Sequence, residues 1–161
     1  MSDMLVKLYA LPDPAPVLAD LRKARVEIRR ALAPERRRIV NWVEENLPEH
    51  AWASECEIAL SRQPLSCFIA VESGQMLGFA CYDATFKNFF GPTGVGTAYR
   101  NRGIGKGLLL ATLSAMAGEG YAYAIVGGVG PAEFYRKAVG AILIEDSTPG
   151  PYRGILKITA K

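Results

Sequence analysis

The sequence predicts an α/β fold in which one mixed sheet carries helices on both faces. Apolar residues recur at helical spacing through the first part of the chain, two β-rich runs joined by a short turn follow, and strand-like and helix-like segments then alternate. Helices, an antiparallel hairpin and a β-α-β-α-β-β series are typical of a sheet covered by helices. A chain of 161 residues is long enough for one domain with its own core.

The N-terminal part is predicted to be mainly helical, because its apolar residues recur every three or four positions. Proline stands at the start of the first two helical runs, where its missing N–H costs nothing. Ser54 can cap the third run, with Glu57 three residues on. The predicted elements are a strand over 6–11 and helices over 16–31, 34–47 and 54–61.

The middle of the chain is predicted to be a hairpin followed by a distorted strand. SCFIAVES and QMLGFACYDAT are rich in β-forming residues, and Ser73-Gly74 between them is a hairpin signal. The next run, NFFGPTGVGTAY, carries glycines and a proline inside a strand pattern. Such residues often mark a bulge or the close approach of a ligand.

The last third is predicted to alternate between helices and strands. A long helix should begin at Gly103 and end near Gly118 and Gly120, and AYAIVGGVG then reads as an apolar, buried strand. PAEFYRKAV is a short helix with proline at its start. Closing strands are expected over 141–145 and 154–159.

Composition predicts a folded protein in the cytoplasm. Half of the residues are hydrophobic and 22% are charged, as in globular proteins. No run approaches the ~20 apolar residues of a membrane span. An early acidic residue and two prolines also argue against a secretory signal at the N-terminus.

The charge pattern favours a small anionic ligand over nucleic acid. The net charge of +3 permits an anion without demanding a polyanion. Bases crowd the N-terminal helices without interleaved aromatic residues, which favours a solvated helix face over a nucleic-acid or membrane surface.

The cysteines are predicted to be reduced thiols in the core. Cys56, Cys67 and Cys81 lie in apolar surroundings and lack the spacing of metal ligands. The single His50 completes no familiar metal pattern with them, so no metal is expected.

The stretch YRNRGIGKGLLL, residues 99–110, resembles two phosphate loops and matches neither. A Walker A loop fails because Arg100 stands at its first glycine and Gly107 at its hydroxyl residue. A dinucleotide fingerprint fails because Leu108 stands at its third glycine. A nucleotide-binding protein is therefore disfavoured.

The remaining pattern, Arg100-x-x-Gly103-x-Gly105, suits a pyrophosphate. Its glycines leave the backbone N–H groups of residues 102–107 open at a helix N-terminus, where the helix dipole favours an anion. A simple turn from strand to helix, made easier by glycine, explains the same residues. The motif alone does not distinguish between the two interpretations. Positive charge comes from Arg100, Arg102 and Lys106.

The loop and a later aromatic pair together resemble the GCN5-related N-acetyltransferase (GNAT) family. Its central motif, Arg or Gln-x-x-Gly-x-Gly or Ala, is matched by residues 100–105 after the bulge-prone GPTGV. Its Phe-Tyr pair is matched by Phe134-Tyr135, about thirty residues on. The sequence departs from the family at Gly128 and Pro131, where Asn and Ala are common, and at Ala141, where Phe often follows the glycine.

The resemblance covers roughly residues 67–144 and implies a GNAT-type, mostly antiparallel sheet with a central bulged strand. It implies one domain over 1–161, with a helical acceptor-side region over about 14–62 and a cofactor-binding core over about 65–145. A bulge would separate its strand from the next and open a slot for the cofactor.

The resemblance also implies direct, metal-free transfer of an acetyl group from acetyl-CoA to a primary amine. The acceptor, a small molecule or peptide, is not identified, and the sequence is compatible with a homodimer. The implied cofactor contacts are Thr93, Gly94 and Val95 for the pantetheine and thioester, and Arg100, Asn101, Arg102, Gly103, Ile104, Gly105, Lys106 and Gly107 for the pyrophosphate.

Tyr135 is the expected general acid, because a phenol is protonated at neutral pH and can supply a proton to the departing thiolate. Phe134 is expected to be a core aromatic residue. Asp83 is the first candidate for the general base, since its end of the strand could face the acceptor; Glu55, Glu57, Glu72 or a water chain are the rivals. The alternative function is a non-catalytic acyl-CoA-binding regulatory or interaction module.

Overall fold

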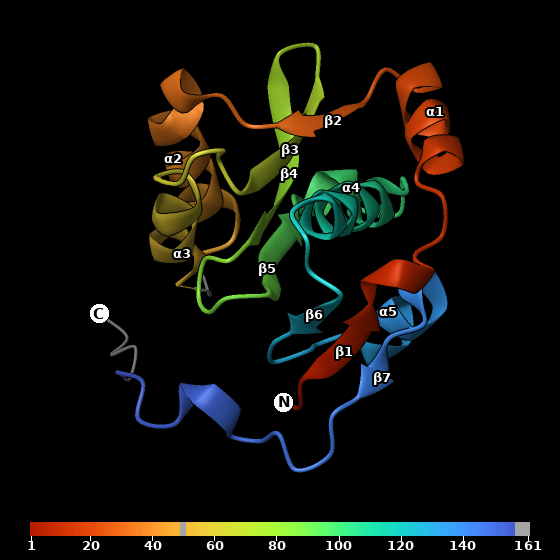
Figure 1. The fold of residues 1–161 in the computed structure, drawn as a ribbon. Helices are drawn as coiled ribbons and strands as arrows, with labels where there is room; N and C mark the ends of the chain where they lie inside the picture. Colours follow the sequence, from red (N-terminus) through yellow and green to blue (C-terminus); the bar gives the residue numbers. More distant parts are fainter. Residues whose placement is uncertain (49–50, 157–161) are drawn as a thin grey trace.

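Seven strands form one sheet in this computed structural model, which describes residues 1–48 and 51–156 (Figure 1). The strands are β1 (Met4–Lys7), β2 (Glu27–Arg30), β3 (Cys67–Glu72), β4 (Gln75–Tyr82), β5 (Phe89–Val95), β6 (Tyr123–Val126) and β7 (Ile142–Leu143). Their spatial order is β2-β3-β4-β5-β6-β1-β7. Neighbours pair antiparallel except β5 and β6, which run parallel. The predicted mixed, mostly antiparallel sheet is confirmed.

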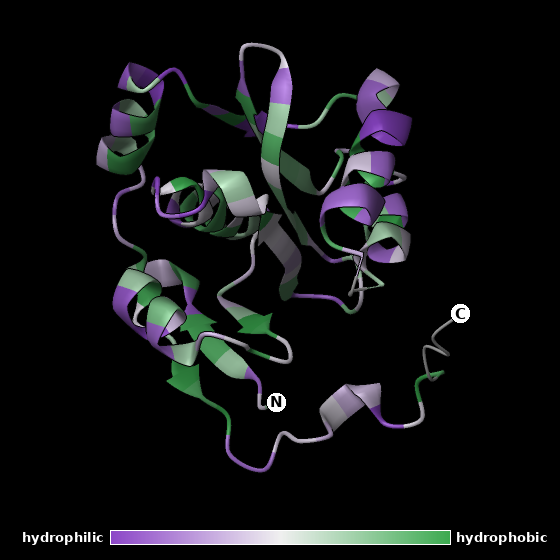
Figure 2. Ribbon diagram, turned by 180° about the vertical axis from the view of Figure 1, so that it is seen from behind, coloured by the Kyte–Doolittle hydropathy of each residue, from purple (hydrophilic) through white to green (hydrophobic). Residues whose placement is uncertain are grey.

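Helices cover both faces of the sheet, as predicted. They are α1 (Ala15–Lys23), α2 (Arg36–Asn46), α3 (Trp52–Ala59), α4 (Ile104–Gly118) and α5 (Ala132–Val139). α4 and α1 belong to one buried cluster with β1 and β6, while α2 and α3 belong to a second cluster on the opposite face. Figure 2 shows apolar residues along much of α4, which is enclosed between the sheet and α1.

The hairpin and the long helix form where the sequence predicts them. β3 and β4 are joined by Ser73 and Gly74, which have φ values of 50° and 77°. Two left-handed residues in a two-residue turn match the twist of a hairpin. α4 begins directly after Gly103 and ends at Gly118.

The helix predicted over 16–31 is divided in the structure. α1 ends at Lys23, and β2 begins four residues later and pairs antiparallel with β3. Arg25 has a left-handed backbone with φ 64°, which turns the chain out of the helix. The prediction was wrong for the second half of this segment, because apolar spacing does not reveal the edge of β3 that pairs with it.

The other boundaries differ by a few residues. The strand predicted over 6–11 becomes β1 and a 3-10 turn, and Pro34 lies in a 3-10 turn (Ala33–Glu35) before α2. α3 starts at Trp52, and the Ser54 side chain does not cap it. Of the predicted closing strands, 141–145 contains β7. Residues 154–156 are not in a strand.

Two sequence expectations concern residues outside the described ranges. The end of the strand predicted over 154–159 lies beyond residue 156, and His50 lies between the two ranges.

β5 carries the predicted bulge. Ala80 pairs with Thr93 and Tyr82 with Phe90, so β5 has one more residue than β4 between these pairs. Gly91 lies in this segment with φ 126°, a conformation that suits glycine. β5 pairs with β6 only through its first two residues. The two strands therefore separate from Gly91 onward, which opens the sheet beside α4 and α5.

Candidate functional site

Two adjoining cavities lie where β5 and β6 separate. The larger cavity, about 470 Å³, extends from this opening toward α3. The smaller cavity, about 170 Å³, extends toward the start of α4 and includes Gly105 in its wall. Phe90, Thr93 and Tyr135 line both cavities. A ligand that enters along α4 and one that enters past α3 would therefore meet at these three residues.

The turn before α4 has the backbone of an anion site. Asn101 and Gly103 are both left-handed, with φ values of 62° and 77°. The Gly107 amide donates to the Gly103 carbonyl at 3.0 Å. Because this bond closes the first helical turn, the amides of residues 104–106 have no partner within the helix. Together with the helix dipole, they form a cradle that favours an anion.

Gly105 and Gly107, near the start of α4, face opposite sides of the helix. At Gly105 an added Cβ would come no closer than 3.8 Å to Val95, so this position is open toward the smaller cavity. At Gly107 an added Cβ would lie 2.4 Å from Leu21 of α1. Because its amide is also bonded within the helix, Gly107 serves helix packing and does not reach the cavity. The Ile104 side chain is likewise buried in the core.

The basic side chains of the loop differ in what they contact. Arg102 donates to Glu72 at 2.7 Å, which ties the loop to the end of β3. Its guanidinium lowers the pKa of the Glu72 carboxyl. Arg100 donates through Nε to the Val95 carbonyl at 3.3 Å. The Lys106 side chain is exposed at the first turn of α4.

The predicted pantetheine contacts lie on β5 beside the smaller cavity. Thr93, Gly94 and Val95 all line it. The Thr93 hydroxyl donates to the Phe79 carbonyl at 3.0 Å, which fixes its side chain on β4. A Cβ at Gly94 would lie 2.5 Å from Leu47, so this glycine also lets the end of α2 pack closely on β5.

Tyr135 projects from α5 to the junction of the two cavities. Only 6% of it is exposed, and its ring packs edge-on against Phe90 and Phe134. Burial raises the pKa of Tyr135 to about 12, so the hydroxyl keeps its proton at neutral pH. Phe134 was predicted to be a core residue, but it is 36% exposed and lines the smaller cavity, because the buried face of α5 runs through Tyr135, Ala138 and Val139.

Asp83 does not line either cavity. Its buried carboxylate accepts hydrogen bonds from the Tyr121 hydroxyl at 2.6 Å and the Asn88 amide at 2.7 Å, and it pairs with Arg62 at 3.2 Å. The hydrogen bond to Asp83 raises the pKa of Tyr121 to about 12. These contacts join three connecting segments, so the geometry gives Asp83 a structural role.

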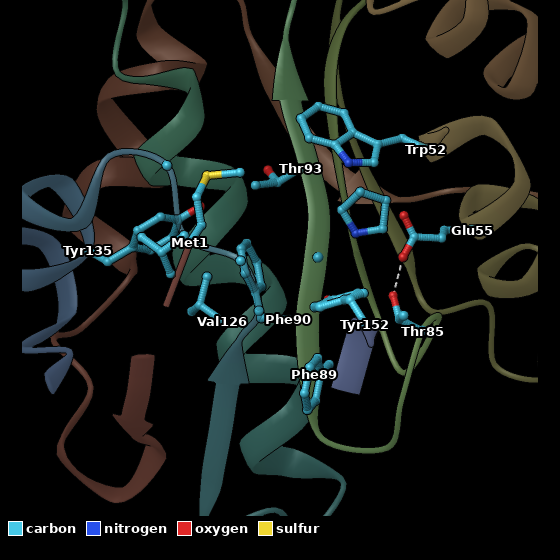
Figure 3. A pocket seen from close by; sticks show the side chains of 16 residues that line it. Met1, Trp52, Glu55, Thr85, Phe89, Phe90, Thr93, Val126, Tyr135 and Tyr152 are labelled. Carbon is cyan, nitrogen blue, oxygen red and sulfur yellow. Dashed lines mark hydrogen bonds between the residues drawn. The ribbon is translucent and has the colours of Figure 1, made fainter. Parts of the chain in front are cut away.

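Of the rival carboxylates, Glu55 is the one that lines the larger cavity. It accepts a hydrogen bond from the Thr85 hydroxyl, and Figure 3 shows it beside Trp52 on the opposite side of β5 from Tyr135. Trp52 and Glu55 are three residues apart on α3 and so share a face. The spacing shows only that the two side chains share a face; the packing of α3 brings that face to the cavity.

Tyr152 is a cavity residue that sequence reasoning missed. It lies in the 3-10 turn Gly150–Tyr152, which follows β7 and passes the open end of β5 and β6 (Figure 1). Its ring packs edge-on against Phe86 at 6.2 Å. No local pattern in STPGPYRG identifies this position, since only the path of the chain brings it to the cavity.

The three cysteines are free and buried, in agreement with their prediction as core thiols. Burial raises the pKa of Cys81 well above its usual value, which keeps the thiol protonated. Among residues 1–48 and 51–156, no three His, Cys, Asp or Glu side chains gather in a way that could hold a metal ion. In the same ranges, none of the helices has the length and apolar character needed to cross a membrane.

Comparison with known proteins places these features in a family. The model of the acetyltransferase (GNAT) family matches residues 25–141. Among curated proteins, none matches the sequence. Three solved structures illustrate the shared fold, and at their level of identity the likeness concerns the fold alone.

The first is a GCN5-related glucosamine N-acetyltransferase region of a fungal multi-domain GH3 beta-N-acetylglucosaminidase (TM-score 0.73, 16% identity), which covers 89% of this chain and 19% of that one. The second is a GCN5-related N-acetyltransferase from Sphaerobacter thermophilus (TM-score 0.65, 20% identity; 89% and 48% covered). The third is a GNAT family acetyltransferase from Brucella melitensis in complex with acetyl-CoA (TM-score 0.53, 22% identity; 74% and 86% covered). The chain thus spans less than half the length of the first two structures.

Proposed function

This chain belongs to the GNAT acetyltransferase family, and on that premise we propose that it transfers an acetyl group from acetyl-CoA to a primary amine. The observation that carries the proposal is the junction of the two cavities at Phe90, Thr93 and Tyr135. One cavity leads to an anion cradle and the other to a carboxylate, as two substrates that react at one point would require.

The residues present fit acetyl-CoA, which would supply an activated acetyl thioester. The amides of residues 104–106 would hold its pyrophosphate, with positive charge from Arg100 and Lys106. The strand segment Thr93–Val95 lies along the smaller cavity, where the pantetheine arm would run. Gly105 leaves room for this arm between Val95 and Phe134.

In this proposal, two side chains carry out the proton transfers. An alkylamine has a pKa of about 10.4 and must lose a proton before it can attack. Glu55 would accept that proton, directly or through a water, in the larger cavity. Tyr135 would give a proton to the departing thiolate at the junction. Holding the two substrates at one point would supply several kcal/mol of barrier lowering, within the ~7–11 kcal/mol available from orientation.

The proposal is tested by thermal unfolding and thiol release with the full chain. Acetyl-CoA should raise the melting temperature, and free thiol should appear when a panel of primary amines is added. Failure of every acyl-CoA to stabilise the protein would overturn the proposal. Stabilisation by CoA without transfer to any amine would instead favour the non-catalytic module. The cytoplasmic location and the homodimer stay predictions from the sequence.

A further inference from the structure

We infer that the larger cavity is a subsite for a small acceptor with one positive charge on an apolar, preferably aromatic, body. This inference rests on the proposed function, because it names the substrate class of the same site. It also assigns Trp52, Glu55 and Tyr152 as the residues that select the acceptor.

The charge of the cavity favours a single ammonium group. Among the described residues, Glu55 is the one acidic side chain that lines it, and no lysine or arginine does so. Met1 also lines the cavity, but it lies beside Tyr135, across β5 from Glu55 (Figure 3). The Thr85 hydroxyl donates to the Glu55 carboxylate and orients it. The carboxylate lies in the first turn of α3, where the helix dipole favours a negative charge. One oriented carboxylate can bind one ammonium group by charge-assisted hydrogen bonds.

The remaining walls are aromatic and apolar. The rings of Trp52, Phe89 and Tyr152 line the cavity around Glu55, together with Phe90 and Tyr135 at the junction (Figure 3). Aromatic faces attract a cation and also pack against a hydrocarbon body. A polycation would bring further charges to walls that hold no second acid among the described residues. The net charge of +3 adds to that disadvantage.

The Tyr152 wall is held in place by the N-terminal strand and by a glycine. The Asp3 amide donates to the Ser147 hydroxyl at 2.8 Å, which fixes the segment that leads to Tyr152. A Cβ at Gly127 would lie 2.5 Å from the Tyr152 hydroxyl, so this glycine admits the tyrosine. Burial, Glu55 and Asp3 raise the pKa of Tyr152, which keeps its ring neutral beside the carboxylate.

The test measures amine binding without catalysis, in the full chain carrying Trp42→Phe so that Trp52 is its one tryptophan. With saturating CoA, fluorescence is titrated with 2-phenylethylamine, with 2-phenylethanol as its uncharged analogue, and with spermidine as a polycation. We expect 2-phenylethylamine to bind at least about tenfold more tightly than either, the usual size of one hydrogen-bonded charge contact. Equal or tighter binding of spermidine would overturn the inference.

Variants locate the selectivity. Glu55→Gln should weaken binding of 2-phenylethylamine about tenfold or more and leave 2-phenylethanol unchanged. Glu57→Gln, on the same helix but outside the cavity, should change neither. Tyr152→Ala should weaken both ligands, whereas Tyr152→Phe should retain most binding. If Glu55→Gln and Glu57→Gln bind 2-phenylethylamine with the same affinity, Glu55 does not bind the charge of the acceptor, and the inference is wrong.

The outcomes separate this inference from the proposed function. Absence of acetyl-CoA binding overturns the proposed function, and the inference with it. Acetyl-CoA binding with spermidine as the better acceptor leaves the proposed function standing and overturns the subsite. Selective binding of 2-phenylethylamine in the cavity without any transfer supports the subsite and contradicts catalysis.

Discussion

Tyr135 and Glu55 lie on opposite sides of β5, and each suits one proton transfer (Figure 3). Tyr135 is buried at the junction and keeps its proton because burial opposes the phenolate. Glu55 is only partly buried, and its carboxylate is held by a threonine hydroxyl. An acid and a base in separate environments can act on two substrates that meet between them.

Tyr135→Phe should lower kcat about 100-fold while the Kd of acetyl-CoA changes by less than about threefold, because it removes a proton donor and keeps the ring. Steady-state kinetics and calorimetry measure the two effects. Tyr121→Phe is the matched control, since Tyr121 also has a pKa of about 12 but its hydroxyl contacts Asp83 and lines neither cavity. Equal losses of kcat and of acetyl-CoA affinity would mean that Tyr135 serves packing and does not donate the proton.

The raised pKa of Tyr135 also predicts how that loss depends on pH. Burial moves the pKa up from 10.0 to about 12, so the proton donor is present well above neutrality. The ratio of kcat between the natural protein and Tyr135→Phe should therefore be the same at pH 7 and pH 10. A ratio that shrinks by pH 10 would mean that the phenol ionises near its ordinary pKa.

Asp83→Asn and Glu55→Gln should have opposite consequences. The Asp83 variant should lose about 1–3 kcal/mol of unfolding free energy and keep its turnover per folded molecule. The expected loss is no larger because the partner of Asp83, Arg62, is 39% exposed, so water can still solvate its charge when the carboxylate is removed. The Glu55 variant should keep its stability and lose acetyl transfer. Urea unfolding and initial rates measure both, and loss of turnover in folded Asp83→Asn would restore Asp83 as the base.

At the scale of elements, α4 combines a core helix with an anion cradle through Gly105 and Gly107. Gly107→Ala and Gly105→Ala add the same methyl and gain similar helix propensity. The unfolding free energy of Gly107→Ala should nevertheless be about 1–3 kcal/mol lower than that of Gly105→Ala, because the new Cβ overlaps Leu21. Urea unfolding of the two variants measures the difference, and equal stability would contradict the packing assigned to Gly107.

Gly105→Leu tests the cradle itself. The side chain should enter the smaller cavity, leave the stability of the free protein little changed and weaken acetyl-CoA roughly tenfold or more by overpacking. Melting temperatures with and without acetyl-CoA measure the two effects separately. Unchanged stabilisation by acetyl-CoA would exclude the smaller cavity as its site.

Elements defined by nearby residues could be predicted, and those that depend on distant partners could not. The Ser73-Gly74 turn, the bulge near Gly91 and the start of α4 after Gly103 follow from local backbone preferences. The change from α1 to β2 escaped prediction because it depends on the edge of β3. The same limit applied to the site, since Glu55 and Tyr152 reach the cavity only through the packing of α3 and the path after β7.

At the scale of the whole molecule, the first strand supports two walls of the larger cavity. β1 lies between β6 and β7, and the Asp3 carboxylate beside it accepts a hydrogen bond from the Gly128 amide at 2.8 Å. The Asp3 amide is bonded to Ser147 on the path to Tyr152. Both walls of the larger cavity on this side therefore depend on the position of β1.

Met4→Ala should test whether the chain unfolds as the single domain that the sequence predicts. Met4 is fully buried in the cluster with α4, so the cavity should cost about 2–5 kcal/mol. Trp42 and Trp52 pack in the other cluster, on the opposite face of the sheet. In one cooperative unit, tryptophan fluorescence and far-UV circular dichroism should show the same lowered urea midpoint.

Leu5→Ala is the matched control, because the neighbouring side chain on β1 is only partly buried on the other face and should cost about 1 kcal/mol. If Met4→Ala leaves the fluorescence midpoint unchanged and moves only part of the dichroism signal, the helical region over about 14–62 folds independently. Equal shifts of the fluorescence and dichroism midpoints would instead mean that a packing defect at β1 destabilises the region around Trp52 through the sheet. The two sides of the molecule would then fold and unfold together.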